Sequence, residues 1–210
     1  MNTPQTGEQL AGEAAARRPP LATRMLAWSG LDAPRLEAAR AVLSERSMRA
    51  SGSMVSAPGA DTAPFSSSYA LSTDETGVLR RLTVRTVCLQ GEQHVTLTRS
   101  EEGIWLVDHG AGAARTDFDG ALDVDLAFSP LFNALPVRRL ALYRTPGEHE
   151  LPMVFVSLPD LEVQLVRQTY RSVSVGDPAV VGFHSGSFDV EITVDSDGLV
   201  LDYPGLAKRA

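Results

Sequence analysis

Alternation of apolar and polar residues with a period of two is the feature that most constrains what this chain can fold into. In FDVEITVD, residues 188–195, every second side chain is apolar, and most of the intervening ones are acidic. Successive side chains of a β-strand point to opposite faces, so this segment presents one face to a core and one to water. The β-branched run LTVRTVCLQ, residues 82–90, predicts a further strand.

Turn sequences connect several of the predicted strands as antiparallel hairpins. SEEG (100–103) lies between HVTLTR and IWLVDH, and DSDG (195–198) precedes LVLDYP. The glycine that ends each turn suits a position that requires positive φ. In LEVQLVRQTY, residues 161–170, the pattern predicts Leu161, Val163 and Leu165 on one face. The sequence therefore predicts a mainly β protein whose antiparallel strands are buried on one side.

Residues 32–46, DAPRLEAARAVLSER, admit two interpretations. An aspartate as N-cap, a proline in the first turn and several alanines favour a helix. The alternative is a hairpin in which residues 37–44 pair with MRASGSMVS across the turn ERS at 45–47. The stretch APGADTAPFSSS, residues 57–68, is predicted to be a loop in either case.

Length, charge and the single cysteine limit the class of protein. With 210 residues, 43% of them hydrophobic, we expect residues 21–210 to fold as one domain with a sizeable core. The net charge of −7 and the lack of a basic run argue against a nucleic-acid binder. Cys88 has no second cysteine to pair with in the chain, which fits a reducing compartment.

The N-terminal segment and the hydropathy pattern bear on location. Residues 1–20 are rich in Ala, Gly, Pro, Gln and Glu and lack the apolar stretch of a secretion signal, so we expect a disordered tail. No apolar run approaches the roughly 18 residues of a membrane-spanning helix. We therefore expect a cytoplasmic protein without an integral membrane segment, and the sequence does not indicate its oligomeric state.

Common catalytic and cofactor motifs do not fit this sequence. HGAGAAR, residues 109–115, resembles a glycine-rich phosphate loop, but Arg115 takes the place of the third glycine. The four histidines lack the spacing of a metal site, so we expect no cofactor and no metal. Asp123 and Asp125 share a strand face at a spacing of roughly 6.6 Å, within the range of about 5–9 Å that the two carboxylates of a glycoside hydrolase require. A solvated or ion-paired strand face gives the same pattern, and we favour that interpretation over the hydrolase.

A long central motif carries a family resemblance. DVDLAFSPLFNALPVRRLAL (123–142), VSLPDLEVQLVRQTY (156–170) and VDSDGLVLDYPGL (194–206) resemble a bacterial family described as "putative glycolipid-binding". The likeness extends over about residues 24–209 and includes Trp28, preceded by Arg24. Residues that match the motifs are Asp123, Asp125, Pro130, Asn133, Leu135, Pro136, Arg138, Arg139, Leu140, Pro159, Asp160, Leu161, Gln168, Tyr170, Asp197, Gly198, Leu199, Val200, Asp202, Tyr203 and Pro204.

The resemblance implies a fold and a class of ligand. The implied fold is a single-domain spiral β-roll, in which a long antiparallel sheet coils around a short buried helix, and it is similar to the open β-barrels that carry lipoproteins. This favours the hairpin over the helix for residues 32–46. The implied function is non-enzymatic binding of a lipid or glycolipid-like amphipathic molecule in an apolar cavity of the roll. A purely structural domain is a further alternative.

The central motif is expected to supply the buried helix. Ser129 is a suitable N-cap and Pro130 a suitable first residue, so we expect a short helix over residues 130–135. Its apolar residues Leu131, Phe132 and Leu135 would plug the roll. We expect Pro136 to end this helix and a strand to follow it.

In such a strand the two arginines point to opposite faces. Arg138 would face the core and Arg139 the solvent, because side chains alternate along a strand. An inward arginine needs a partner, which is either an aspartate or helix C-terminal carbonyl groups, or else an acidic or sugar headgroup. We expect no catalytic residue, and the expected ligand contacts are Arg138, Phe132, Asn133, Leu140, Trp28 and Tyr170.

Overall fold

The computed structural model describes residues 21–59 and 63–210, which form one continuous sheet of 15 strands. The strands are β1 (Ala22–Gly30), β2 (Arg35–Leu43), β3 (Met48–Ser56), β4 (Phe65–Thr73), β5 (Leu79–Cys88), β6 (Gly91–Arg99), β7 (Trp105–Asp108), β8 (Ala113–Thr116), β9 (Asp123–Leu126), β10 (Glu148–Val156), β11 (Val163–Ser174), β12 (Ala179–Ser185), β13 (Phe188–Val194), β14 (Val200–Tyr203) and β15 (Ala207–Arg209). A 3₁₀ turn, η1 (Phe118–Gly120), and one α-helix, α1 (Pro130–Arg139), complete the described elements.

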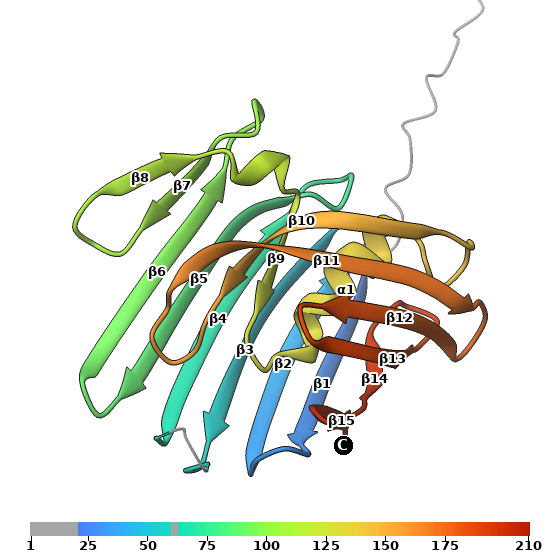
Figure 1. Ribbon diagram of the computed structural model, residues 1–210, viewed down its shortest axis with the longest axis horizontal. Helices are drawn as coiled ribbons and strands as arrows, with labels where there is room; N and C mark the ends of the chain where they lie inside the picture. The colour runs from blue at the N-terminus through green and yellow to red at the C-terminus, as the bar shows by residue number, and fades with distance from the viewer. Residues whose placement is uncertain (1–20, 60–62) are drawn as a thin grey trace, which may run out of the picture.

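The strand order confirms the expected mainly β class. Along the sheet the order is β8-β7-β6-β5-β4-β3-β2-β1-β15-β14-β13-β12-β11-β10-β9 (Figure 1). Neighbouring strands are antiparallel except β9 and β10, which are parallel. Strands β8 and β9 form the two ends of this order, so the sheet is not closed into a barrel. The N-terminal and C-terminal halves meet where β1 pairs with β15.

Residues 32–46 contain a strand, so the hairpin interpretation is confirmed. Strand β2 pairs with β3 along its whole length, from Arg35 opposite Ser56 to Leu43 opposite Met48. Every second residue of β2 is buried. The alanines that raise helix propensity serve here as small inward side chains, because packing against the rest of the roll outweighs local propensity.

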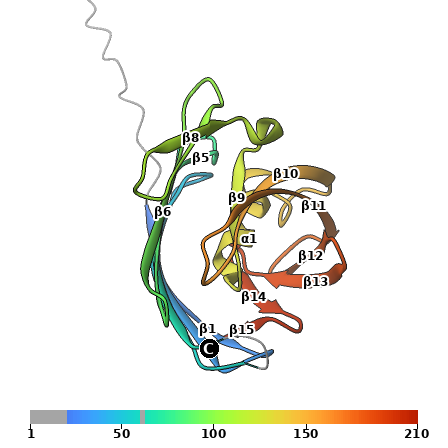
Figure 2. The same cartoon turned by 60° about the vertical axis from the view of Figure 1, so that its left-hand side comes forward.

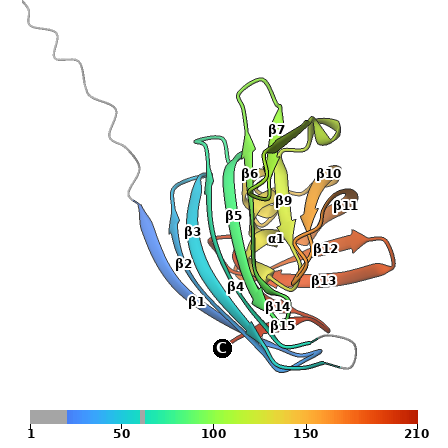
Figure 3. The same ribbon diagram turned by 90° about the vertical axis from the view of Figure 1, so that its left-hand side faces the viewer.

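The sheet coils so that its concave side encloses α1. Figures 2 and 3 show β1–β6 as one curved wall, with α1 and the C-terminal strands β10–β14 on the concave side. One apolar cluster lies between this wall and the first half of α1, and a second surrounds Val137 and strands β10–β14. Trp28, Trp105 and Phe132 are among the largest fully buried side chains. The predicted spiral roll around a short buried helix is therefore confirmed.

Helix α1 is longer than the sequence predicts, because it continues through Pro136. It ends at Arg139, and hydrogen-bonded turns over residues 140–144 follow it instead of a strand. Pro136 has no N–H group to donate to the carbonyl of Phe132, which costs one helical hydrogen bond. Burial of Val137 and Arg138, which are 0% and 4% exposed, offsets this cost when both stay helical.

Two other local predictions are wrong in part. Strand β4 begins at Phe65, so the last four residues of the predicted loop over 57–68 are strand, and Phe65 and Ser67 point inward. In β11 the buried face carries Gln168 and Tyr170, whereas Leu165 is 42% exposed. Both faces of β11 contain apolar residues, so its pattern alone does not choose between them.

Three expectations concern features beyond the sheet. The predicted tail, residues 1–20, lies outside the described residues. In the part of the chain that the structure describes, no helix is long and apolar enough to cross a membrane. Across those same residues, no group of three or more His, Cys, Asp or Glu side chains is placed to hold a metal ion.

Candidate functional site

Polar contacts fix both ends of α1, and the contact at its N-terminal end is a buried acid. Ser129, the N-cap, makes no side-chain capping bond, and its hydroxyl lies 2.5 Å from Oε1 of Glu37. The Tyr69 hydroxyl donates to the same oxygen at 2.5 Å. Tyr69 reaches Glu37 across β3 because Gly52 lies beneath it, where a Cβ would be 2.4 Å from the Tyr69 hydroxyl oxygen. Gly52 is therefore required for this cluster.

Glu37 is 2% exposed, and its second oxygen, Oε2, has no hydrogen-bond partner among the described residues. Burial raises the pKa of Glu37 to about 7, and the hydrogen bonds from Ser129 and Tyr69 oppose this rise only in part. The nearby positive charge of Arg35 acts in the same direction as those hydrogen bonds. The N-terminal end of α1 is thus held by a carboxyl group that changes charge near neutral pH.

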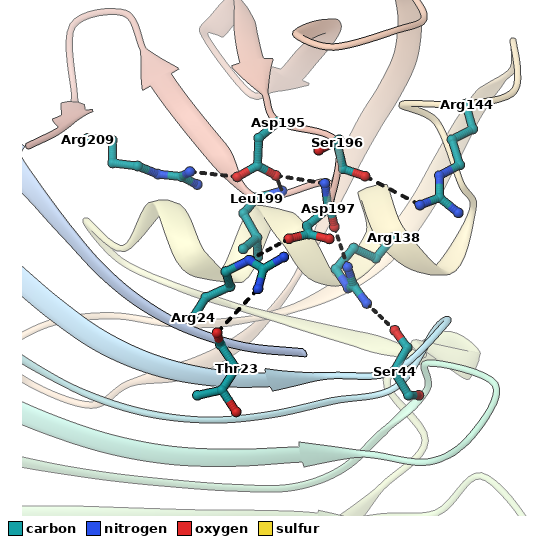
Figure 4. A network of polar contacts seen from close by, with 10 residues as sticks. All are labelled: Thr23, Arg24, Ser44, Arg138, Arg144, Asp195, Ser196, Asp197, Leu199 and Arg209. Carbon is teal, nitrogen blue, oxygen red and sulfur yellow. Dashed lines mark hydrogen bonds and ion pairs between the residues drawn. The ribbon is translucent and has the colours of Figure 1, made fainter. Parts of the chain in front are cut away.

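At the other end of α1, Arg138 joins three parts of the fold (Figure 4). Its guanidinium donates one hydrogen bond to the carbonyl oxygen of Asp197 and another, at 2.7 Å, to that of Ser44. These carbonyls lie in the β13–β14 turn and the β2–β3 turn. Burial lowers the pKa of Arg138. The expectation that Arg138 faces the core is confirmed. The expected partner, an aspartate or helix C-terminal carbonyl groups, is wrong, because the guanidinium binds backbone carbonyl groups of two turns.

Three more arginines surround the turn at residues 195–198 (Figure 4). Arg24 of β1 binds the carboxylate of Asp197 at 2.7 Å, and Arg209 of β15 binds that of Asp195 at 2.6 Å. The third, Arg144, lies 3.4 Å from a carbonyl oxygen of the turn. Four guanidinium groups therefore converge on a turn with two carboxylates. The turn that DSDG predicts is confirmed, and its glycine has φ of 75°.

A depression of about 350 Å³ lies beside this turn. Its volume is at the lower limit of small-molecule sites. The guanidinium carbon of Arg144 lies 4.7 Å from the centre of the Tyr143 ring, so a cation and an aromatic ring border the depression together. This combination can receive a polar or acidic headgroup that carries a short apolar part. The lining residues are Tyr143, Arg144, Val175, Gly176 and Ser196.

Arg139 does not face solvent, which corrects the prediction for the second arginine. Successive residues of a helix are about 100° apart, so the alternation of a strand does not apply. The Arg139 side chain is 12% exposed and binds Asp123 through two nitrogens, with distances of 2.5 Å and 3.0 Å to Oδ2. Asp123 itself is 1% exposed. For Asp123 the ion-paired interpretation is confirmed, and the solvated one is wrong.

Asp125 ends a chain of hydrogen bonds that leads back to α1. Gln168 donates to Asp125 at 2.7 Å, the Tyr170 hydroxyl donates to Gln168 at 3.0 Å, and the Asn133 amide donates to Tyr170 at 3.0 Å. Burial raises the pKa of Asp125 to about 6, against the opposing effect of the Gln168 hydrogen bond. Neither Asp125 nor Asp123 lines the depression.

The six expected ligand contacts lie on or around α1, and the structure buries five of them. Arg138, Phe132, Asn133, Trp28 and Tyr170 are each at most 4% exposed. Leu140, the C-cap of the helix, is half-buried. Most polar atoms in this group already have protein partners, such as the Trp28 indole nitrogen, which donates to a carbonyl oxygen of β14 at 2.9 Å.

Sequence reasoning does not find two residues of the site. Glu37 shares an inward face with Arg35 and Ala39, a signal that becomes readable only after β2 is accepted as a strand. Arg144 follows the helix in an irregular segment, and no local motif marks it.

The fold and the site define a class of protein, a coiled sheet around one buried helix with a polar depression beside the helix's C-terminal end. A family model described as "Putative glycolipid-binding" matches residues 25–209, and the chain belongs to that family. The crystal structure of a DUF1089 family protein from Pseudomonas aeruginosa is similar, with a TM-score of 0.68 and 28% sequence identity. That similarity covers 97% of this chain and 100% of the other. No curated protein matches the chain.

Proposed function

We propose that the protein binds an amphipathic, glycolipid-like molecule without transforming it, and that the depression beside the 195–198 turn holds the polar headgroup. The observation that carries this proposal is the combination of ring, guanidinium and aliphatic side chain at that depression, supplied by Tyr143, Arg144 and Val175. Family membership supports the ligand class, since the family's description names glycolipids.

The apolar part of the ligand is proposed to lie against α1 and its surroundings. Because side chains fill this space in the present conformation, a ligand enters it only when α1 moves away from the sheet. Such a movement breaks the contact between Ser129 and Glu37 at one end of the helix, or those of Arg138 at the other. The proposed contacts in this region are Trp28, Phe132, Asn133, Arg138, Leu140 and Tyr170.

Displacement of a fluorescent fatty acid tests this proposal. In a series of ligands with one acidic headgroup, affinity should rise by about 0.8 kcal/mol per buried methylene and then level off. Arg144→Gln should weaken binding roughly tenfold, as expected for a lost charged hydrogen bond. The matched control is Arg115→Gln, at an exposed arginine of β8, which should leave affinity unchanged. Equal affinity across all chain lengths and both variants would show that the proposal is wrong.

A glycoside hydrolase is the second candidate, and Asp125 is the reason for it. Burial raises its pKa to about 6, and burial also raises the pKa of the neighbouring Asp123, against the opposing effect of Arg139. Two nearby carboxyl groups, of which one can stay protonated close to neutral pH, are what glycoside hydrolysis uses. We expect no turnover of aryl glycosides above that of a buffer blank. Turnover that Asp123→Asn or Asp125→Asn abolishes would favour the hydrolase and contradict the non-enzymatic proposal.

A further inference from the structure

The convex face of the N-terminal wall has a charge distribution unlike that of the whole chain. The chain has 26 acidic residues and a net charge of −7. Strands β1–β5 nevertheless contain a single acid, Glu37, and it points into the core. Alternation directs four arginines of these strands outward, namely Arg40, Arg49, Arg81 and Arg85. This face is therefore positive within an acidic protein.

Three of these outward arginines have no ion-pair partner among the described residues. Arg85 binds Glu92 of β6 at 2.9 Å. Arg40, Arg49 and Arg81 form no ion pair within residues 21–59 and 63–210. An unpaired surface guanidinium presents all its N–H groups to an anion and offers bidentate geometry to a phosphate.

Strand register brings the three free arginines together. Arg40 and Arg49 are diagonal neighbours across the β2–β3 pair, and Ser72 alone separates Arg49 from Arg81 in one row across β3, β4 and β5. Adjacent strands are about 4.8 Å apart, so the second pair spans roughly 10 Å. A depression of about 290 Å³ lies between Arg40 and Arg49. It is lined by Arg40, Val42, Arg49, Ala50 and Ser51.

Exposed aliphatic side chains accompany the arginines on this face. Met25 is 74% exposed and lies directly opposite Arg40 across the β1–β2 pair. Leu36 and Val55, opposite each other on β2 and β3, are 53% and 61% exposed. Serine and alanine occupy the outward positions of β4, so no large side chain of this strand covers the neighbouring arginines. Free arginines next to exposed aliphatic groups are the composition expected of a surface that contacts lipid headgroups.

We propose that this convex face, centred on Arg40, Arg49 and Arg81, docks the protein on the surface of an anionic phospholipid bilayer. The guanidinium groups bind headgroup phosphates, and the Met25 side chain, next to Arg40, enters the headgroup region of the bilayer. A soluble polyanion would engage the arginines but would give no role to the exposed aliphatic residues. The proposal goes beyond ligand binding and does not rest on it, because this face lies on the side of the wall away from α1 (Figure 2).

Vesicle flotation with the full chain tests the docking face. We expect binding to phosphatidylcholine vesicles that contain phosphatidylserine, weakening with added salt, and little binding to phosphatidylcholine alone. The triple variant Arg40→Gln, Arg49→Gln, Arg81→Gln should reduce the partition coefficient about 100-fold, at about fivefold per arginine. A double variant, Arg40→Gln, Arg49→Gln, should lose about 25-fold, and its control Arg167→Gln, Arg171→Gln, which removes the same charge from exposed positions of β11 in the other half of the roll, should bind as wild type does.

Three outcomes would overturn the docking face. Equal losses in the two double variants would show that net charge, and not this face, drives binding. Equal binding to neutral and anionic vesicles would remove the role of the arginines. A third outcome is that heparin displaces the protein from vesicles, that each of the three arginine substitutions weakens vesicle binding equally, and that Met25→Gln leaves it unchanged. This outcome would assign the face to soluble polyanions. These vesicles contain no glycolipid, so the result is independent of the ligand-displacement assay.

Discussion

Glu37 and Asp125 are single residues through which pH acts on the stability of the fold. An acid whose pKa rises on folding keeps a proton that the unfolded chain has released, so stability is lost as pH rises from the unfolded pKa to the folded one. This interval extends from 4.5 to about 7 for Glu37 and from 3.8 to about 6 for Asp125. Both residues therefore contribute a fall in the free energy of unfolding between acidic and neutral pH.

Glu37→Gln should remove the contribution of this residue to that fall. At 1.36 kcal/mol per pKa unit, the shift corresponds to about 3 kcal/mol. The free energy of unfolding of the variant, relative to that of wild type, should therefore be about 3 kcal/mol higher at pH 7.5 than at pH 4.5. Urea unfolding at the two pH values measures this difference. Asp125→Asn is the matched comparison. Its relative gain in the free energy of unfolding should be complete at a lower pH, because the pKa of Asp125 is about 6. A Glu37→Gln variant with the pH dependence of wild type would contradict the raised pKa of Glu37.

Breaking the ion pair of Arg139 with Asp123 should cost far more than breaking an exposed pair. Arg139→Gln leaves a buried carboxylate without its cation, which typically costs about 3–5 kcal/mol in the free energy of unfolding. Arg85→Gln, which breaks the exposed pair with Glu92, should cost less than about 1 kcal/mol. Adding Asp123→Asn to Arg139→Gln should restore part of the loss, because no uncompensated charge then remains. Equal small losses in the two single variants would place Arg139 in solvent.

At the scale of elements, the sequence predicts the strands better than the helix. Alternation reports which face of a strand is buried, so hairpins such as β6–β7 and the turn before β14 follow from the residues alone. Strand β2 does not, because its alanine-rich composition favours a helix and only the family resemblance indicates a hairpin. The end of α1 is missed because the usual effect of Pro136 is outweighed by burial of the two residues that follow it.

The candidate site is less predictable than the fold for a physical reason. The inward position of Arg138 follows from its apolar neighbours, but its partners come from turns that are 94 and 59 residues away in the chain. Arg24 and Asp197 are separated by 173 residues. Contacts over such separations depend on the final coiling of the sheet, and a single sequence contains no local pattern that reports them.

Phe132 should be the residue through which α1 contributes most to the core. It is 1% exposed, and its ring packs against that of Tyr69 at a centroid distance of 5.1 Å. Phe132→Ala should lower the free energy of unfolding by about 3–5 kcal/mol, measured in denaturant melts. Phe188→Ala, at a ring that is 64% exposed, is the control and should change stability by less than about 0.5 kcal/mol. A loss below about 1 kcal/mol for Phe132→Ala would mean that α1 does not plug the roll.

At the scale of the whole molecule, the roll depends on a short seam between its two halves. Strand β15 pairs with β1 through only three residue pairs, and Ala210 adds one backbone hydrogen bond to Ala27 at 2.9 Å. A side-chain contact adds to the seam, since the guanidinium carbon of Arg209 lies 5.7 Å from the centre of the Trp28 ring in β1, while the same guanidinium binds Asp195 of the β13–β14 turn. The seam holds the β13–β14 turn, and with it the depression, against the N-terminal wall.

Deletion of residues 207–210 should therefore loosen the halves relative to each other while leaving the strands of each half paired. At roughly 1 kcal/mol per ladder hydrogen bond, we expect a loss of about 2–4 kcal/mol in the free energy of unfolding. Hydrogen exchange should accelerate at the amides of Trp28–Gly30 that face β15, and in β14, but not in β4 or β5. Arg209→Gln in the full chain separates the two contributions, because it removes the side-chain contacts and keeps the strand. If the deletion leaves exchange in β1 unchanged, β15 does not join the two halves, and the position of the depression must depend on the remaining contacts between them, such as those of Arg24, Arg138 and Trp28.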